Sequence, residues 1–279
     1  MLDLIQITND PAFARRCDAI PGMRLWVDLE RMGKAERQAG RNTFISIHAL
    51  DDVGRVKSAL SRARLMVRVN PLHAGSREEV DAVIAQGADL IMLPMFENAA
   101  TLRAFSQIVA GRRPIVPLVE TAGALETLGQ WLDTPGLHEV YVGLNDLHLS
   151  LGQRFMFEPL ALGLVDRVAE AAASRGLRFG FGGIARLDEG LLPGRAVLAE
   201  HLRLGSGAVI LSRTFHRPDS DAVFEREVES LRRAESELAL RDAQTVAREA
   251  EATRETIARI AAAMAQKPAT GVGRTDPPS

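Results

Sequence analysis

The stretch from Leu65 to Leu93, LMVRVNPLHAGSREEVDAVIAQGADLIML, begins and ends with a short apolar run. Runs of this kind, rich in branched aliphatic side chains, are typical of parallel strands covered on both faces. Between the runs, Ser76 followed three residues later by Glu79 predicts a capping box that starts a helix, and Gly87 is placed to end it. The stretch therefore predicts a strand, a helix and a second strand parallel to the first.

The same alternation of strand and helix continues through most of the chain. Repeated units of this kind either close into a TIM (β/α)8 barrel or stay open as a doubly wound sheet, and the glycine fingerprint of the open dinucleotide-binding sheet is absent after the first run. We therefore predict the α/β class and a single TIM barrel. Nine runs compete for its eight strands: Leu2 to Thr8, Arg24 to Leu29, Thr43 to Ile47, Leu65 to Asn70, Asp89 to Leu93, Ile115 to Val119, Glu139 to Gly143, Leu177 to Phe181 and Ala208 to Leu211. We expect Thr43 to Ile47 to be the surplus run, with Leu2 to Thr8 as the alternative.

Composition and charge exclude several classes of protein. The 279 residues are 46% hydrophobic and 25% charged, which is typical of a folded globular chain. With 34 Lys and Arg against 36 Asp and Glu, the net charge of −2 provides no basic field for nucleic acid or an anionic membrane. No apolar run approaches the roughly 18 residues that cross a bilayer. Because the single Cys17 cannot form an internal disulfide and the first residues lack the features of a signal peptide, we expect a cytoplasmic protein.

The C-terminal part of the chain has a different composition from the rest. We expect residues 1–218 to form the barrel, residues 219–266 to form a long helical extension, and residues 267–279 to be a disordered tail. Apolar positions from Phe224 to Leu238 fit a helix face that closes over the barrel. Those from Ala243 to Met264 alternate by threes and fours as in a weak coiled-coil seam, so that an oligomer contact and a solvated extension both stay open.

Two carboxylates follow neighbouring predicted strands. Glu120 ends the run Ile115 to Val119, and Asp146 follows the run Glu139 to Gly143. Active-site groups of a parallel barrel come from the carboxyl ends of its strands. Two hard oxygen ligands at this place suit Mg²⁺ or Mn²⁺, although either carboxylate alone could simply cap the next helix. We predict that Glu120 and Asp146 form a divalent metal site.

Arg68 lies inside an apolar run, where burying a guanidinium is costly unless it meets an anion. Its planar fork could bind the carboxylate or enolate of a substrate, or it could form a structural ion pair with an acid on a neighbouring strand. Polar residues at the corresponding ends of strands are further candidates for binding a substrate, namely Asn70, Thr121 and Asn145.

A glycine-rich turn, Gly180 to Gly183, follows the seventh predicted barrel strand. At this corner of a barrel, backbone N–H groups often hold phosphate, so that Gly182 and Gly183 are candidate substrate ligands. Plain turn chemistry explains the same glycines. If the turn holds phosphate, the substrate carries a phosphoryl group.

Several of these segments together resemble the HpcH/HpaI aldolase and citrate lyase beta-subunit family, in that family's order and rough spacing over about residues 1 to 215. The segments are Asp28-Leu29-Glu30, Val67 to Pro71, Gly87 to Pro94, Val119 to Ala122 and Gly143 to Gly152. The resemblance implies a pyruvate-binding (β/α)8 barrel that makes or breaks a carbon–carbon bond next to an enolate. It also implies that Glu120 and Asp146 hold a divalent metal, that Arg68 contacts the keto acid and its developing enolate oxygen, and that the chain forms trimers or hexamers through its last barrel helix.

The general base is where the sequence departs from this family. Family members carry a histidine or a second acid after the motif that reads Asp28-Leu29-Glu30 here, whereas this chain has Arg31. His48 is one candidate replacement, because the ordinary pKa of a histidine lies close to neutral pH, and Glu30 is the other. A lone histidine before a helix is also a common structural residue.

Together, the residues and the resemblance predict a metal-dependent carbon–carbon lyase or aldolase. Its substrate would be a keto acid or hydroxy-keto acid, possibly phosphorylated or linked to coenzyme A, and its partner would be another copy of itself. Two alternatives stay open: a phosphate-binding barrel isomerase centred on Gly180 to Gly183, and a non-catalytic relative that binds a keto acid or acts as a scaffold.

Overall fold

The computed structural model describes residues 1–33, 47–215 and 221–266. Within them, eight parallel strands form a closed barrel in chain order. The strands are β1 (Asp3–Ile7), β2 (Met23–Asp28), β3 (Arg64–Arg68), β4 (Leu90–Leu93), β5 (Ile115–Val119), β6 (Glu139–Val142), β7 (Arg178–Ile184) and β8 (Ala208–Leu211). The predicted fold class is confirmed.

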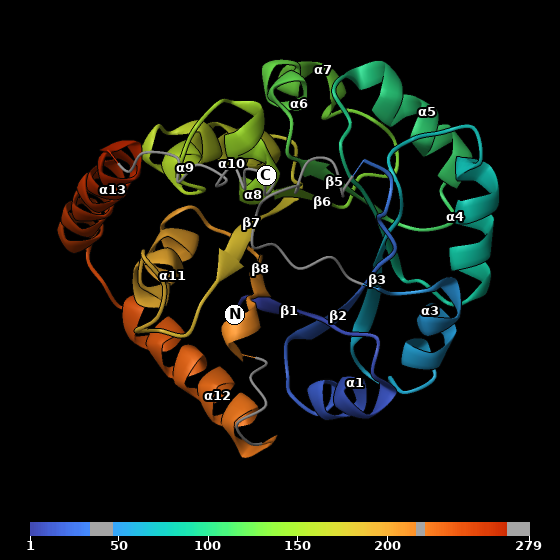
Figure 1. Ribbon diagram of the computed structural model, residues 1–279, viewed down its shortest axis with the longest axis horizontal. Helices are drawn as coiled ribbons and strands as arrows, with labels where there is room; N and C mark the ends of the chain where they lie inside the picture. Colours follow the sequence, from blue (N-terminus) through green and yellow to red (C-terminus); the bar gives the residue numbers. More distant parts are fainter. Residues whose placement is uncertain (34–46, 216–220, 267–279) are drawn as a thin grey trace, which may run out of the picture.

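Helices surround the barrel and cover its outer face (Figure 1). They are α1 (Pro11–Asp18), α3 (Leu50–Lys57), α4 (Ser76–Ala85), α5 (Ala99–Val109), α6 (Ala122–Glu126), α7 (Leu128–Trp131), α8 (Leu144–Ser150), α9 (Glu158–Ala161), α10 (Leu164–Ala173), α11 (Gly194–Arg203), α12 (Asp221–Leu238) and α13 (Ala243–Gln266), with the 3₁₀ turn η1 (Arg213–Phe215) after β8. No helix among the described residues is long and apolar enough to cross a membrane.

Layers of side chains fill the barrel interior. At its amino end, Arg24 forms ion pairs with Asp3 (Nη2 to Oδ2, 2.6 Å) and Glu139 (Nη1 to Oε1, 2.9 Å). Above this charged layer lies a buried cluster that includes Trp26 and Tyr141. The barrel interior is therefore filled toward its amino end, and the cavity that enters it lies at the carboxyl ends of the strands.

The eight barrel strands correspond to eight of the nine predicted runs. Leu2 to Thr8 contains β1, which pairs with both β2 and β8, so the alternative of dropping it is wrong. Because β2 pairs directly with β3, no place for a strand exists between them. Of the surplus run, residues 43–46 lie outside the described residues, and Ile47 lies outside any strand.

The predicted capping box is wrong. Helix α4 begins at Ser76 itself, with Gly75 as the preceding cap residue, and no side chain makes the capping hydrogen bond. The Ser76 hydroxyl instead accepts a hydrogen bond from the His73 N–H, and the Glu79 carboxylate accepts from Asn70. The helix does end as predicted, since Gly87 follows its last turn with φ +96°.

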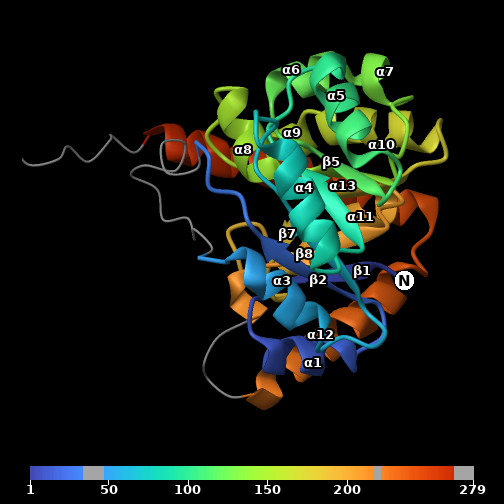
Figure 2. The ribbon, with the colours of Figure 1, turned by 90° about the vertical axis from the view of Figure 1, so that its right-hand side faces the viewer.

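The two C-terminal helices pack against the chain itself. The predicted apolar face of α12 is buried, including Phe224, Val228 and Leu231. Helix α13 packs on α9 and α11, and its buried side chains include Thr253 and Ile257 from the predicted seam. The view in Figure 2 shows these helices outside the ring of strands. Residues 267–279 lie outside the described part of the chain.

Candidate active site

A cavity of about 590 Å³ lies at the carboxyl ends of the strands. Its lining includes most of the predicted site residues, which come from five different strands or the segments after them: His48, Arg68, Glu120, Asn145, Asp146, Gly182 and Gly183. Glu30, Asn70 and Thr121 are not among the lining residues. The chain thus brings two of the predicted acids and the predicted arginine to one cavity.

Arg68 is held by two carboxylates. Its Nε and Nη2 donate to the two carboxylate oxygens of Asp28 at 2.8 and 2.9 Å, and its Nη1 forms an ion pair with Glu30 at 3.2 Å. The guanidinium also lies over the Trp26 ring, 4.9 Å from the ring centroid. The structural ion pair considered for Arg68 is therefore present. Since a guanidinium has five N–H donors, these three contacts leave two for a ligand in the cavity.

Glu120 is buried in a crowded electrostatic environment. Its Oε1 accepts a hydrogen bond from the Met95 N–H at 3.0 Å. Burial, the largest influence, raises the pKa of Glu120, the Arg68 charge lowers it, and the Glu30 and Asp146 charges raise it further, to about 8. The carboxylate form is thus disfavoured by two like charges, a situation that a bound cation would relieve.

The residues present fit a divalent cation held mainly by small ligands. Glu120 and Asp146 are both buried, and both line the cavity. Within the residues that the structure describes, no group of three or more His, Cys, Asp or Glu side chains is arranged to hold a metal. Mg²⁺ commonly binds through only one or two carboxylates and keeps water or substrate oxygens for its other positions, so this pair is a sufficient protein contribution.

The geometry of His48 does not suit a general base. Its Nδ1 accepts a hydrogen bond from the Asp28 backbone N–H at 3.0 Å. A neutral imidazole that accepts at Nδ1 carries its proton on Nε2. The lone pair of Nδ1 is therefore in use, and Nε2 can donate a hydrogen bond but cannot accept a proton. The prediction of His48 as the proton acceptor is therefore at odds with this arrangement, which makes it a donor.

Two predicted substrate ligands have structural contacts instead. The Asn70 amide donates to Glu79 and accepts from the backbone N–H groups of Arg31 and Met32, so it fixes the loop after β2. The Thr121 hydroxyl donates to the Phe96 carbonyl and accepts from Ala124 N–H as the cap of α6.

The prediction of a turn at Gly180 to Gly183 is wrong, because these residues lie within β7, and a neighbouring side chain accounts for the irregular strand there. The register of β7 on β8 shifts between Gly180 and Gly183. The Tyr141 hydroxyl lies in this irregularity, donating to the Gly182 carbonyl at 2.8 Å and accepting from the Ile210 N–H at 2.9 Å. A Cβ at Gly180 would lie 2.6 Å from the Tyr141 ring. Gly180 therefore makes room for the tyrosine, and this glycine needs no phosphate to account for it.

Some residues important to the site were missed from the sequence. Asp28 belongs to one of the family-like segments, but the sequence does not identify it as the partner of Arg68, although the two lie opposite each other in the β2–β3 register. Trp26, two residues earlier on the same strand face, places its ring beneath Arg68. Met95 supplies its N–H to Glu120 from a backbone with φ +53°, which no local sequence pattern indicates.

These features define a (β/α)8 barrel with an acidic, arginine-containing cavity at the carboxyl ends of its strands. Residues 9–177, more than half of the chain, match the family described as HpcH/HpaI aldolase/citrate lyase. The chain therefore belongs to this family, as the resemblance of its motifs predicted. None of the curated proteins matches this sequence.

Solved structures of the family have the same fold. The HpcH/HpaI aldolase from Desulfitobacterium hafniense DCB-2 is 16% identical, with 83% of this chain and 93% of that chain covered and a TM-score of 0.59. The citrate lyase beta subunit from M. tuberculosis, complexed with oxaloacetate and magnesium, is 19% identical, with 81% and 96% covered and a TM-score of 0.56. At these identities the likeness concerns the fold.

Proposed function

We propose that the protein is a divalent-metal-dependent carbon–carbon lyase or aldolase that acts on a small keto acid through a pyruvate-like enolate. The observation that carries this proposal is the meeting of Glu120, Asp146 and Arg68 on one cavity. Membership of a family of aldolases and citrate lyases supports it. A structural neighbour that holds oxaloacetate and magnesium supports the same substrate class and the same kind of metal.

Glu120 and Asp146 would hold Mg²⁺ or Mn²⁺. When bound, such an ion supplies Lewis-acid stabilisation of the negative charge that develops on the enolate oxygen. Asp28 and Glu30 contact three of the five N–H groups of Arg68. The other two would bind the carboxylate or enolate oxygen of the substrate. Because Asp28 fixes the fork and Trp26 lies below it, these donors are oriented before the substrate arrives.

For the proton transfer Glu30 stays the prediction, although its carboxylate is paired with Arg68 and does not line the cavity. Nδ1 of His48 already accepts a hydrogen bond from the Asp28 backbone N–H, which leaves Glu30 as the remaining predicted base. Its carboxylate lies on Nη1 of Arg68, next to the group that would hold the substrate. Nε2 of His48, which lines the same cavity, would donate a hydrogen bond to the substrate.

The cavity is larger than pyruvate requires, and part of its wall is apolar. Ile7, Met156 and Ile210 line it together with the charged residues. A volume of about 590 Å³ is typical of sites for molecules well above the size of a three-carbon acid. The space beyond the metal site would accept the second part of the substrate, the aldehyde or acyl group.

Proton exchange tests the proposal without knowledge of that second part. The purified protein is incubated with pyruvate and Mg²⁺ in D₂O, and the methyl proton signal is followed by NMR. We expect the signal to decay with the wild-type protein. Glu120→Gln should lower the exchange rate about 100-fold or more, because loss of a charge-stabilising contact costs several kcal/mol in the barrier.

Glu126→Gln is the matched control, because Glu126 is exposed and lies on the next helix. It should exchange at the wild-type rate. Exchange that is absent with wild-type protein, or that continues unchanged in Glu120→Gln, would count against the enolate chemistry.

A further inference from the structure

A second hollow lies at the opposite end of the barrel from the candidate active site. It has a volume of about 450 Å³ and is lined at the amino ends of β3, β4 and β5. Its charged lining residues are Lys57, Arg62, Arg64, Arg112 and Arg113, with Asp89 as the only carboxylate. Five cations therefore surround one acid, in a chain whose net charge is −2.

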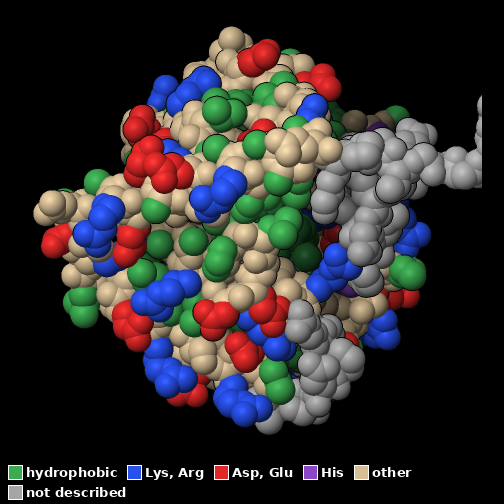
Figure 3. Space-filling model, turned by 60° about the vertical axis from the view of Figure 1, so that its left-hand side comes forward, with side chains coloured by type: hydrophobic (Ala, Val, Ile, Leu, Met, Phe, Trp, Pro, Cys, Tyr) green, Lys and Arg blue, Asp and Glu red, His purple; other side chains and the backbone are tan. Residues whose placement is uncertain are grey.

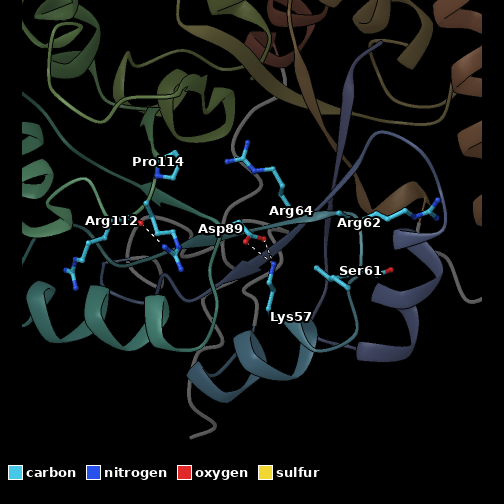
Figure 4. Close-up of a pocket in the computed structure, with 10 residues that line it drawn as sticks. Lys57, Ser61, Arg62, Arg64, Asp89, Arg112 and Pro114 are labelled. Carbon is cyan, nitrogen blue, oxygen red and sulfur yellow. Dashed lines mark hydrogen bonds and ion pairs between the residues drawn. The ribbon is translucent and has the colours of Figure 1, made fainter.

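Two of these cations have their own carboxylate. The Lys57 ammonium lies 2.7 Å from the Asp89 carboxylate, which also accepts a hydrogen bond from the Leu65 N–H. Arg112 forms an ion pair with Asp81 at 2.7 Å. Figure 4 shows Lys57 turned toward Asp89, whereas Arg64 points away from that carboxylate.

Arg62 contributes little to the hollow. Its Nη2 donates to the backbone carbonyl of Asp18 at 2.8 Å, and Figure 4 shows its side chain directed outward. It is exposed, so that water screens its charge.

The remaining two guanidiniums, Arg64 and Arg113, meet only neutral acceptors among the described residues. Arg64 Nη1 donates to His138 Nε2 at 3.2 Å. Arg113 donates to the carbonyls of Ala88, at 2.6 Å, and Arg112, at 2.7 Å. Both side chains are half-buried, where an uncompensated charge is less well screened than at the surface.

Charges of both signs act on Arg64. Burial lowers the pKa of the Arg64 guanidinium, and the charges of Arg24 and Arg178 lower it further, against the opposing effect of Asp89 and Glu139. The His138 pKa is lowered as well, by burial and by Arg64, so this ring accepts from Arg64 as a neutral group and adds no charge to the hollow. The excess of positive charge at the hollow therefore comes from its lining residues, where five cations meet one carboxylate.

We propose that this hollow at the amino end of the barrel binds a small oxyanion with two or more negative charges, between Arg64 and Arg113. Planar guanidinium groups donate two parallel hydrogen bonds to phosphate or carboxylate oxygens, and a concave site concentrates the field of its charges. The chemistry shared by phosphoryl groups and polycarboxylates is what the site would recognise. It differs from the candidate active site in lacking an acidic pair for a metal.

Calorimetric titration of the full-length protein with inorganic pyrophosphate, without divalent metal, tests the proposal. We expect saturable binding to one site on the wild-type chain. Arg113→Gln should weaken it about tenfold or more, since one charged hydrogen-bonding partner contributes about that factor. Arg64→Gln should do the same, but Arg113→Gln is the safer variant because Arg113 lies before β5 rather than inside the barrel. A parallel titration with citrate separates phosphoryl from carboxylate recognition.

Arg195→Gln is the matched control. Arg195 lies on α11, is exposed and pairs with Glu237, and the substitution removes the same charge without touching the hollow. Pyrophosphate should bind this variant as it binds the wild-type protein, and Arg113→Gln should keep the wild-type rate of pyruvate proton exchange.

Three outcomes would overturn the proposal. One is the absence of saturable binding of both pyrophosphate and citrate to the wild-type protein. Another is wild-type affinity in both Arg64→Gln and Arg113→Gln. The third is weakening by Arg213→Gln, which lines the other cavity, because the anion would then bind at the carboxyl end of the barrel. Exchange activity is not needed for any of these readings, so the two proposals can fail separately.

Discussion

Asp28 determines how Arg68 is presented to the cavity. It accepts two hydrogen bonds from the guanidinium and gives its backbone N–H to His48, so that one residue orients two predicted site residues. The pair is buried, with Arg68 8% and Asp28 2% exposed. A buried ion pair is sensitive to loss of one partner, because the other charge stays behind without compensation.

We predict that Asp28→Asn lowers the rate of pyruvate proton exchange about tenfold or more and lowers the free energy of unfolding by about 2 kcal/mol or more. The amide keeps the shape of the side chain but loses the charge. NMR exchange and urea denaturation measure the two effects. Asp188→Asn, a change at an exposed acid, should alter neither. Wild-type exchange in Asp28→Asn would show that Arg68 does not depend on Asp28 for its position.

His201 provides a test of pH dependence away from the site. Its ring is fully buried, stacks on Phe181 with 3.8 Å between ring centroids, and contacts the Ser206 hydroxyl through Nδ1. Burial lowers the pKa of His201 to about 3. The folded state therefore keeps the ring neutral at pH values where the unfolded chain, with a pKa near 6.5, takes up a proton.

From this difference we predict that His201 makes stability fall as the pH drops below about 6.5. Between pH 7.5 and 5, the single proton taken up by the unfolded chain would lower the free energy of unfolding by about 2 kcal/mol. His201→Phe keeps an aromatic ring against Phe181 but cannot titrate. Between pH 7.5 and 5 its free energy of unfolding should therefore fall by about 2 kcal/mol less than that of the wild-type protein. Equal pH slopes for the two proteins, measured by urea denaturation, would show that His201 is protonated in the folded state.

At the scale of elements, β7 depends on glycine where it passes Tyr141. A Cβ at Gly180 would lie 2.6 Å from the Tyr141 ring and 2.8 Å from the Ala208 carbonyl oxygen. Neither neighbour can withdraw easily, since the tyrosine hydroxyl is fixed between β7 and β8 and the carbonyl belongs to β8.

Gly180→Ala should therefore lower the free energy of unfolding by about 1–3 kcal/mol through overpacking. Gly129→Ala is its control, because Gly129 lies in α7 and a Cβ there would meet nothing within 4 Å. The control should be neutral or slightly stabilising, since alanine favours a helix. Chemical denaturation of both variants gives the comparison, and equal stabilities would contradict the close approach of Tyr141.

The strands were predictable because buried parallel strands are continuous apolar runs, as in Leu90–Leu93 and Ala208–Leu211. Local capping was less predictable. The Ser76 and Glu79 spacing satisfies the capping pattern, but Glu79 binds Asn70, in the connection between β3 and α4, instead of the start of its own helix. Likewise, Asn70 and Thr121 are at the ends of strands as expected, but their side chains form hydrogen bonds with the backbone of Arg31 and Phe96.

The candidate site shows the same division. Position along a strand was enough to select Arg68, Glu120 and Asp146, because all active-site groups of a barrel come from one end of its strands. The position of His48 in the sequence does not show whether its ring donates or accepts a hydrogen bond. The acceptor role of His48 Nδ1 depends on a backbone N–H of β2, which is twenty residues away in the chain.

For the whole molecule, α12 continues the ring of helices between α11 and α1, and α13 lies outside that ring (Figure 1). Arg and Lys are interspersed with Asp and Glu on the face shown in Figure 3, with apolar side chains between them. The predicted seam of α13 is used within the chain, where it packs on α9 and α11. Assembly into trimers or hexamers stays a prediction, and it would have to use other surfaces than these buried seam positions.

Ile257 anchors α13, since its side chain is fully buried in the main hydrophobic core. Ile257→Ala should lower the free energy of unfolding by about 2–5 kcal/mol, the usual cost of removing a large aliphatic side chain from a core. Glu255→Ala, on an exposed position of the same helix, should cost much less. If the two variants unfolded at the same denaturant concentration, α13 would not be a stable part of the folded chain.

Binding of Mn²⁺ at Glu120 and Asp146 is the most direct test of the account. Titration of the purified protein with Mn²⁺, followed by electron paramagnetic resonance, counts the bound ions. We predict one tight site on the wild-type chain and at least about tenfold weaker binding in both Glu120→Gln and Asp146→Asn, because each substitution removes an anionic oxygen ligand. Wild-type protein that binds no Mn²⁺, or variants that bind it as tightly as the wild-type protein, would contradict the account.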